Sequence, residues 1–201
     1  AQRNVRATLP FGGPFAPQTV NERDVRQAHI RFGVRIDASA TSSTFRALKM
    51  YSRMISGGMS SPLFQDIRDK RGLCYGVGAG CETNSDRGAF IASISTDPAR
   101  IMEAIDAIHG VFGQYKADAA LLAQEKRSWL GENLITLCNP GSIMSRAIGG
   151  VAIYGYPRTP EEIQAEVDSV TIDNVTQAVE KHLLDRSRYM YAYVVPKGTK
   201  I

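Results

Sequence analysis

The chain has 201 residues, and 43% of them are hydrophobic, which is enough to bury one sizeable core. The formal net charge is only +4, with both signs mixed along the sequence, so the charge pattern argues against a nucleic-acid-binding protein. Three cysteines without a C-x-x-C pair predict neither a disulfide framework nor a cysteine zinc site, and no apolar run approaches the roughly 18 residues of a membrane helix.

Prolines and glycines are concentrated in the first part of the chain, between Pro10 and Pro17. Such a composition is typical of connecting segments. We therefore expect residues 1–24 to be a linker or a segment that leads into the domain, and residues 25–201 to form a single domain. The absence of an initiator Met predicts that the chain begins partway through a longer polypeptide.

The first predicted elements are a strand followed by two helices. Alternating apolar residues over 27–36 predict a half-buried strand. A helix is predicted over residues 44–55 because apolar residues recur there at helical spacing, at Phe45, Leu48, Tyr51 and Ile55. Ser61 and Pro62 favour the start of a second, short helix, and Gly72 is expected to end it.

The rest of the chain predicts a hairpin, a run of helices and a last strand. Residues 73–79 and 89–95 are β-prone and flank a turn-rich segment at 84–88. Helices are predicted from residue 97, over 118–137, and from Pro140, Pro160 and Thr171, before an apolar strand at 189–195. The helix over 118–137 is expected to be an amphipathic cover helix, whose apolar side includes Leu122, Trp129, Leu130 and Leu134. This order departs from regular βαβ alternation. It favours an α+β fold with an antiparallel or mixed sheet and helices packed on one face.

One segment carries a specific resemblance. Residues 57–78 read GGMSSPLFQDIRDKRGLCYGVG. The features that carry the resemblance are the glycines, the paired serines, Ile67-Arg68, Arg71-Gly72-Leu73 and Tyr75. In order and spacing they resemble a signature of the second domain in insulinase and pitrilysin family zinc peptidases, which include the mitochondrial processing peptidases. The resemblance implies the metallohydrolase-like α+β domain of that family. Two positions depart from the pattern: Pro62 stands where Arg is usual, and Cys74 stands where a small residue is usual, although Cys is itself small enough to keep the strand unchanged.

The resemblance implies a role for Arg68 and Tyr75. In that family an Arg near the end of the short helix and a Tyr seven residues later bind substrate and complete an active site on another domain. A peptide carbonyl under hydrolysis develops negative charge on its oxygen, and a guanidinium and a phenol can donate hydrogen bonds to it. The alternative for each residue alone is structural, since an Arg that ends a helix is usually a solvated cation and a strand Tyr usually belongs to the core.

The metal site that the resemblance implies, H-x-x-E-H, is absent from the chain. His29, His109 and His182 are far apart in the sequence, and each is expected to be a surface or helix-packing residue. We therefore expect no zinc or other cofactor in this chain, and no activity from the chain alone. Zinc is expected in a partner domain or subunit.

Two functions remain open from the sequence. The first is a substrate-binding domain that completes the active site of an insulinase-family zinc endopeptidase, with a zinc-bearing domain or subunit and a peptide as its partners. The second is a non-catalytic structural subunit of the same fold. Neither nucleic acid nor membrane insertion is expected, and the bacterial periplasm or cytoplasm is favoured over the mitochondrial matrix.

Overall fold

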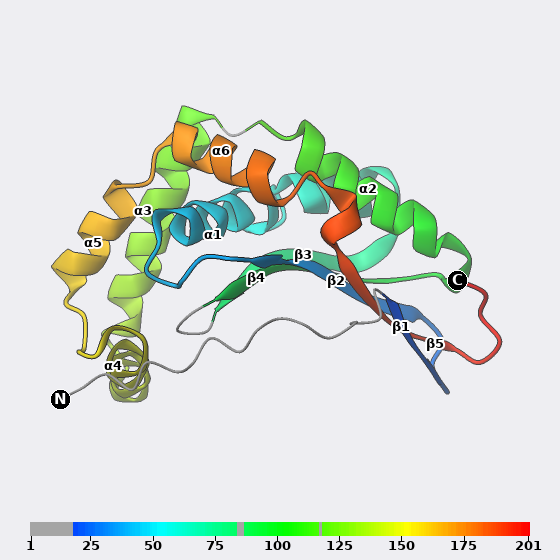
Figure 1. The fold of residues 1–201 in the computed structure, drawn as a ribbon, viewed down its shortest axis with the longest axis horizontal. Helices are drawn as coiled ribbons and strands as arrows, with labels where there is room; N and C mark the ends of the chain where they lie inside the picture. The colour runs from blue at the N-terminus through cyan, green and yellow to red at the C-terminus, as the bar shows by residue number, and fades with distance from the viewer. Residues whose placement is uncertain (1–17, 84–86, 117) are drawn as a thin grey trace.

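The computed structural model describes residues 18–83, 87–116 and 118–201. Within these residues the backbone forms one five-stranded mixed sheet and a layer of helices over one of its faces (Figure 1). The strand order is β1-β5-β2-β4-β3. The strands are β1 (Gln18–Arg23), β2 (Ala28–Ile36), β3 (Cys74–Thr83), β4 (Gly88–Thr96) and β5 (Met190–Pro196). The predicted α+β class is confirmed.

The helices begin where the sequence predicts them. Asn139 accepts hydrogen bonds from two backbone N–H groups of its helix, and Thr159 and Thr171 each form a reciprocal capping box. None of the helices in the described part of the chain combines the length and the apolar character needed to cross a membrane. The bounds are α1 (Ser43–Ser56), η1 (Phe64–Lys70), η2 (Pro98–Arg100), α2 (Ile101–Gln114), α3 (Ala119–Thr136), α4 (Pro140–Tyr154), α5 (Pro160–Asp168), α6 (Ile172–His182) and η3 (Arg186–Arg188).

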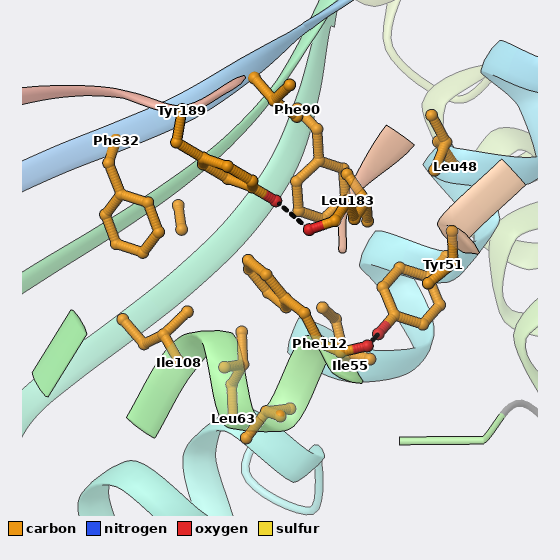
Figure 2. Close-up of a cluster of buried hydrophobic side chains, with 14 of the residues drawn as sticks. Phe32, Leu48, Tyr51, Ile55, Leu63, Phe90, Ile108, Phe112, Leu183 and Tyr189 are labelled. Atoms are coloured by element: carbon orange, nitrogen blue, oxygen red, sulfur yellow. Dashed lines mark hydrogen bonds between the residues drawn. The ribbon is translucent and has the colours of Figure 1, made fainter. Parts of the chain in front are cut away.

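The core lies between the sheet and the helices. The predicted stripe of α1 is buried, and so is one face of β2, at Ala28, Ile30, Phe32, Val34 and Ile36. Two buried tyrosines donate hydrogen bonds to backbone carbonyls, Tyr51 between α1 and α2 and Tyr189 between the start of β5 and the end of α6 (Figure 2). Tyr51 donates to Phe112 O at 3.2 Å, and Tyr189 donates to Leu183 O at 3.0 Å. Since a buried hydroxyl without a partner is costly, these bonds fix the depth at which each ring enters the core.

The sheet contains a strand that the sequence did not predict. Residues 18–23, within the segment expected to lead into the domain, form β1 and pair in parallel with β5. The pairing joins the two ends of the described chain, from Gln18 opposite Tyr191 to Arg23 opposite Pro196. These six residues therefore belong to the sheet. Residues 1–17 and the expected turn residues 84–86 lie outside the described structure.

Helix α3 covers less of the core than its spacing predicts. Leu122 is buried, but Leu134, expected on the same inward face, is 61% exposed. The helix packs on α1 and α5, and its last turns extend beyond them toward α4 (Figure 1). Trp129 and Leu130, near the middle of the helix, are partly buried against the core. The prediction that α3 is an amphipathic cover helix is therefore right as far as Leu130 and wrong for its last turns.

The histidines have the packing and surface positions expected of them. His29 is exposed on the face of β2 opposite the helices, whereas His109 and His182 are each 5% exposed. The His109 ring lies among Phe32, Phe112 and Tyr189, and its Nε2 is 3.1 Å from the Tyr191 hydroxyl. Burial, assisted by the Arg186 cation and opposed by Asp106, lowers the pKa of His109 to about 4.

This burial predicts a loss of stability in mild acid. Because the pKa of His109 is about 4 in the folded chain and near 6.5 in an unfolded one, the unfolded state binds the proton first. The free energy of unfolding should thus be steady above pH 6.5 and fall between pH 6.5 and 4, and protonation of His109 should account for a loss on the order of 3 kcal/mol at pH 4. His182 acts in the same direction, since burial also lowers its pKa.

Urea unfolding at several pH values measures the effect. His109→Phe should flatten the decline below pH 6.5, whereas His29→Gln, at an exposed position, should leave it unchanged. An equal decline in wild type and His109→Phe would assign the acid sensitivity to other groups.

Candidate functional site

The helix that carries Arg68 has an unusual geometry. Helical backbone begins at Pro62, as predicted, and then widens into a π-helix over η1. The Arg71 N–H donates to Asp66 O, five residues back, at 3.2 Å. Gly72 ends the helix in the left-handed region, with φ of +57°, which favours glycine. Short π-helical turns are rare and are frequent at functional sites.

The strand that carries Tyr75 has a β-bulge at that residue. Cys74 pairs with Thr96 and Val77 pairs with Ile94, so two residues of β3, Tyr75 and Gly76, stand opposite one residue of β4. A bulge changes the direction in which a side chain points. Strict alternation would place Tyr75 on the inward face with Leu73, which is 3% exposed, but Tyr75 is 83% exposed. Tyr75 is therefore not a core residue.

The bulge brings Tyr75 beside Arg68. The Arg68 Cζ lies 4.8 Å from the centroid of the Tyr75 ring and 4.4 Å from that of the Phe64 ring. Both distances are within the range of cation–π contacts. Among the residues that the structure describes, no carboxylate lies within 4.0 Å of the Arg68 guanidinium. Its position is thus set by two aromatic faces, and its planar N–H donors are not engaged by an acidic neighbour.

A shallow hollow begins next to the pair, on the sheet face opposite the helices. It has a volume of about 470 Å³, and small or polar residues line much of it. Gly76, which follows Tyr75 directly, lines it together with Gly78, Ser93, Ser95 and His29. The His29 Nδ1 is 2.8 Å from the Ser95 hydroxyl. An extended chain could therefore lie close to the sheet backbone here.

The site does not fit thiol chemistry. Cys74 precedes Tyr75, and burial raises the pKa of its thiol, although the Arg68 cation opposes this effect. A thiol with a raised pKa is protonated near neutral pH and is a poor nucleophile. Cys74 is therefore a packing residue beside the pair.

The residues around Arg68 and Tyr75 do not fit a zinc site either. In the described residues no group of three or more His, Cys, Asp and Glu side chains could hold a metal ion. The loop before η1 is a tight turn, with Gly58 at a φ of +127° and the Ser61 N–H donating to Gly58 O at 3.1 Å. What the arrangement offers is a pair of hydrogen-bond donors, from Arg68 and Tyr75, beside a hollow.

The sequence predicted Arg68 and Tyr75 as candidate site residues but not the residues that surround them. Phe64 lies within the motif, yet nothing in its position indicated a contact with Arg68. Thr96 and Arg100 donate hydrogen bonds to the turn that joins the two site residues, from more than twenty residues away in the sequence. No local pattern signals such contacts.

Comparison with known sequences gives one family. Residues 9–128 match the sequence profile of a family described as Peptidase M16 inactive domain. An uncharacterized zinc protease of Mycobacterium bovis, Mb2805c, is 31% identical over 185 residues, which cover 90% of this chain and 42% of that protein. For the uncharacterized zinc protease YmxG of Bacillus subtilis the identity is 24% over 180 residues, covering 88% of this chain and 43% of that protein. The chain thus spans about two fifths of the length of these relatives.

Solved structures share the fold. A peptidase M16 inactive domain from Pseudomonas fluorescens superposes with a TM-score of 0.73 at 20% identity, covering 92% of this chain and 44% of that one. A crystallised inactive peptidase domain from Bordetella parapertussis gives a TM-score of 0.73 at 17% identity, covering 90% of this chain and 96% of that one. At these identities the likeness concerns the fold, and the family assignment comes from the sequence match. The chain belongs to the M16 peptidase inactive-domain family.

Proposed function

We propose that this domain binds peptide substrate and completes the active site of an M16-family zinc endopeptidase, with the zinc site supplied by another domain or subunit. The described residues of this chain do not fit a zinc site, and the longer relatives are named zinc proteases. The peptide-bond chemistry would therefore require both parts. The role of this chain is to hold the substrate and to stabilise charge.

The exposed pair of Arg68 and Tyr75 carries the proposal. A tyrosine ring that is 83% exposed and stacked on a guanidinium contributes little to a core, and its hydroxyl can reach a bound molecule. During peptide hydrolysis the carbonyl oxygen becomes negative, and prepositioned N–H and O–H donors stabilise that charge. Arg68 can in addition hold a backbone carbonyl of the substrate through its planar fork.

The first test concerns metal content. The isolated chain should retain no stoichiometric zinc after dialysis, because a zinc site needs at least three closely placed ligands. Atomic absorption on dialysed protein measures it, with a chelator-treated sample as the baseline. One tightly held zinc per chain would contradict the proposed division between the two parts.

The second test is Tyr75→Phe in the peptidase assembled with its zinc-bearing part. The change removes one hydroxyl and keeps the ring that stacks on Arg68. Loss of a single oxyanion donor typically lowers kcat by roughly 10²–10³, and the KM for a peptide substrate should change little because the interaction strengthens in the transition state. Steady-state kinetics with a melting curve distinguishes this from loss of folding.

Tyr156→Phe is the matched control, since Tyr156 is also exposed, at 47%, and lies outside η1 and β3. It should leave kcat unchanged. Equal kcat values for Tyr75→Phe and Tyr156→Phe would remove Tyr75 from the mechanism.

The third test is Arg68→Lys. Lysine keeps the positive charge but loses the planar fork that can bind two acceptors at once. We expect kcat/KM to fall, by less than in a change to Ala, while the melting temperature stays close to that of wild type. Arg186→Lys, at an exposed ion pair with Asp106, is the control and should behave as wild type. Normal turnover in both Arg68→Lys and Tyr75→Phe would favour the alternative, a non-catalytic structural subunit.

A further inference from the structure

The relative position of Arg68 and Tyr75 depends on a short connection. Arg68 lies on η1 and Tyr75 on β3, so the two side chains meet only if the turn between these elements keeps its shape. The turn consists of Arg71, Gly72 and Leu73, with Gly72 in the left-handed region. A shift of this turn would move the Tyr75 ring relative to the Arg68 guanidinium.

All three backbone carbonyls of the turn accept hydrogen bonds from side chains of one other segment. Arg100 Nη2 donates to Arg71 O at 3.2 Å, and Arg100 Nη1 donates to Gly72 O at 3.3 Å. Thr96 Oγ1 donates to Leu73 O at 2.7 Å. Thr96 ends β4 and Arg100 ends η2, so both donors belong to the connection between β4 and α2.

The guanidinium of Arg100 is itself held in place. Glu103, in the first turn of α2, accepts from Arg100 Nε at 2.8 Å and from Arg100 Nη2 at 2.9 Å. A two-point contact of this kind fixes the plane of a guanidinium as well as its position. Arg100 therefore presents its remaining N–H groups to the turn in one orientation. A lysine, with a single ammonium group, could not make these contacts together.

Thr96 acts at the bulge. It is fully buried and pairs with Cys74, the last register pair of β3 and β4 before Tyr75 leaves the regular ladder. Its hydroxyl holds the carbonyl of Leu73, directly before that pair. Thr96 thus fixes the backbone at the point where the bulge begins.

We propose that Thr96 and Arg100 are positioning residues, which hold the turn of Arg71, Gly72 and Leu73 and thereby set the contact between Arg68 and Tyr75. The significance of that contact for catalysis rests on the proposed function, but the contact itself is a property of this chain. Neither residue lines the hollow. Their effect is exerted through three backbone carbonyls.

The test measures the contact directly, by NMR of the ¹⁵N-labelled chain. The two aromatic rings that the Arg68 guanidinium faces should shift its Nε–Hε resonance, and Arg68→Lys identifies the resonance by removing it. Tyr75→Leu then gives the part of the shift that comes from the Tyr75 ring. Arg100→Met, which keeps most of the side-chain length without the guanidinium, should abolish at least half of that part.

Threonine variants separate the hydroxyl from the methyl group. Thr96→Val keeps the shape and loses the donor to Leu73 O, so it should also abolish at least half of the Tyr75-dependent shift. Thr96→Ser keeps the donor and should retain the shift. Equal shifts in the valine and serine variants would overturn the assignment of the effect to this hydrogen bond.

Arg186→Met is the control for Arg100→Met, because it removes another exposed Arg that forms an ion pair with an acidic residue of α2, Asp106. It should leave the Arg68 resonance unchanged. If Arg100→Met and Thr96→Val lower the melting temperature but leave the resonance in place, the two residues only stabilise the fold and the proposal is wrong. The measurement uses neither zinc, partner nor substrate, so its failure is distinct from the kinetic failure of Tyr75→Phe.

Discussion

One-sided burial of the sheet is the constraint on which the rest of the structure depends. The inward face of β2 is closed by the helix layer, and within this core the hydroxyls of Tyr51 and Tyr189 each donate to a backbone carbonyl. Because the apolar side chains of the sheet are buried on the face that the helices cover, the opposite face can carry small and polar residues. The hollow beside Gly76 lies on this opposite face, and β3 is an edge strand of the sheet.

The parts of the fold that could be predicted are those set by local chemistry. The stripe of α1 repeats at helical spacing, and the caps at Asn139, Thr159 and Thr171 act on N–H groups two or three residues away. Strand β1 lacks a comparable signal: its sequence, QTVNER, is mostly polar, and it becomes a strand by pairing with β5, about 170 residues later. The exposure of the last turns of α3 is similarly a matter of where the neighbouring helices end.

The site shows the same division between local and distant causes. Arg68 and Tyr75 could be named from the sequence only through a family resemblance, since alternation alone assigns Tyr75 to the core. The structure reverses that orientation with a bulge, and a bulge depends on the pairing of β3 with β4 rather than on the residues of β3 alone. Thr96 and Arg100 could not be found at all without the fold, because their contacts span 23 to 29 residues.

Because Tyr75 is exposed, Arg68 and Tyr75 would need a second surface to exclude water before they could stabilise a negative charge effectively. In water, a hydrogen bond to a developing negative charge replaces one that the solvent already provides, so a donor that is 83% exposed gains little. The same donor becomes effective when another surface excludes water, because electrostatic interactions strengthen as the local dielectric constant falls. On the proposed function, the zinc-bearing part would therefore contribute the enclosure as well as the metal. Arg68 and Tyr75 can remain solvated in this domain alone without promoting hydrolysis, and would act only where the two parts meet around a peptide.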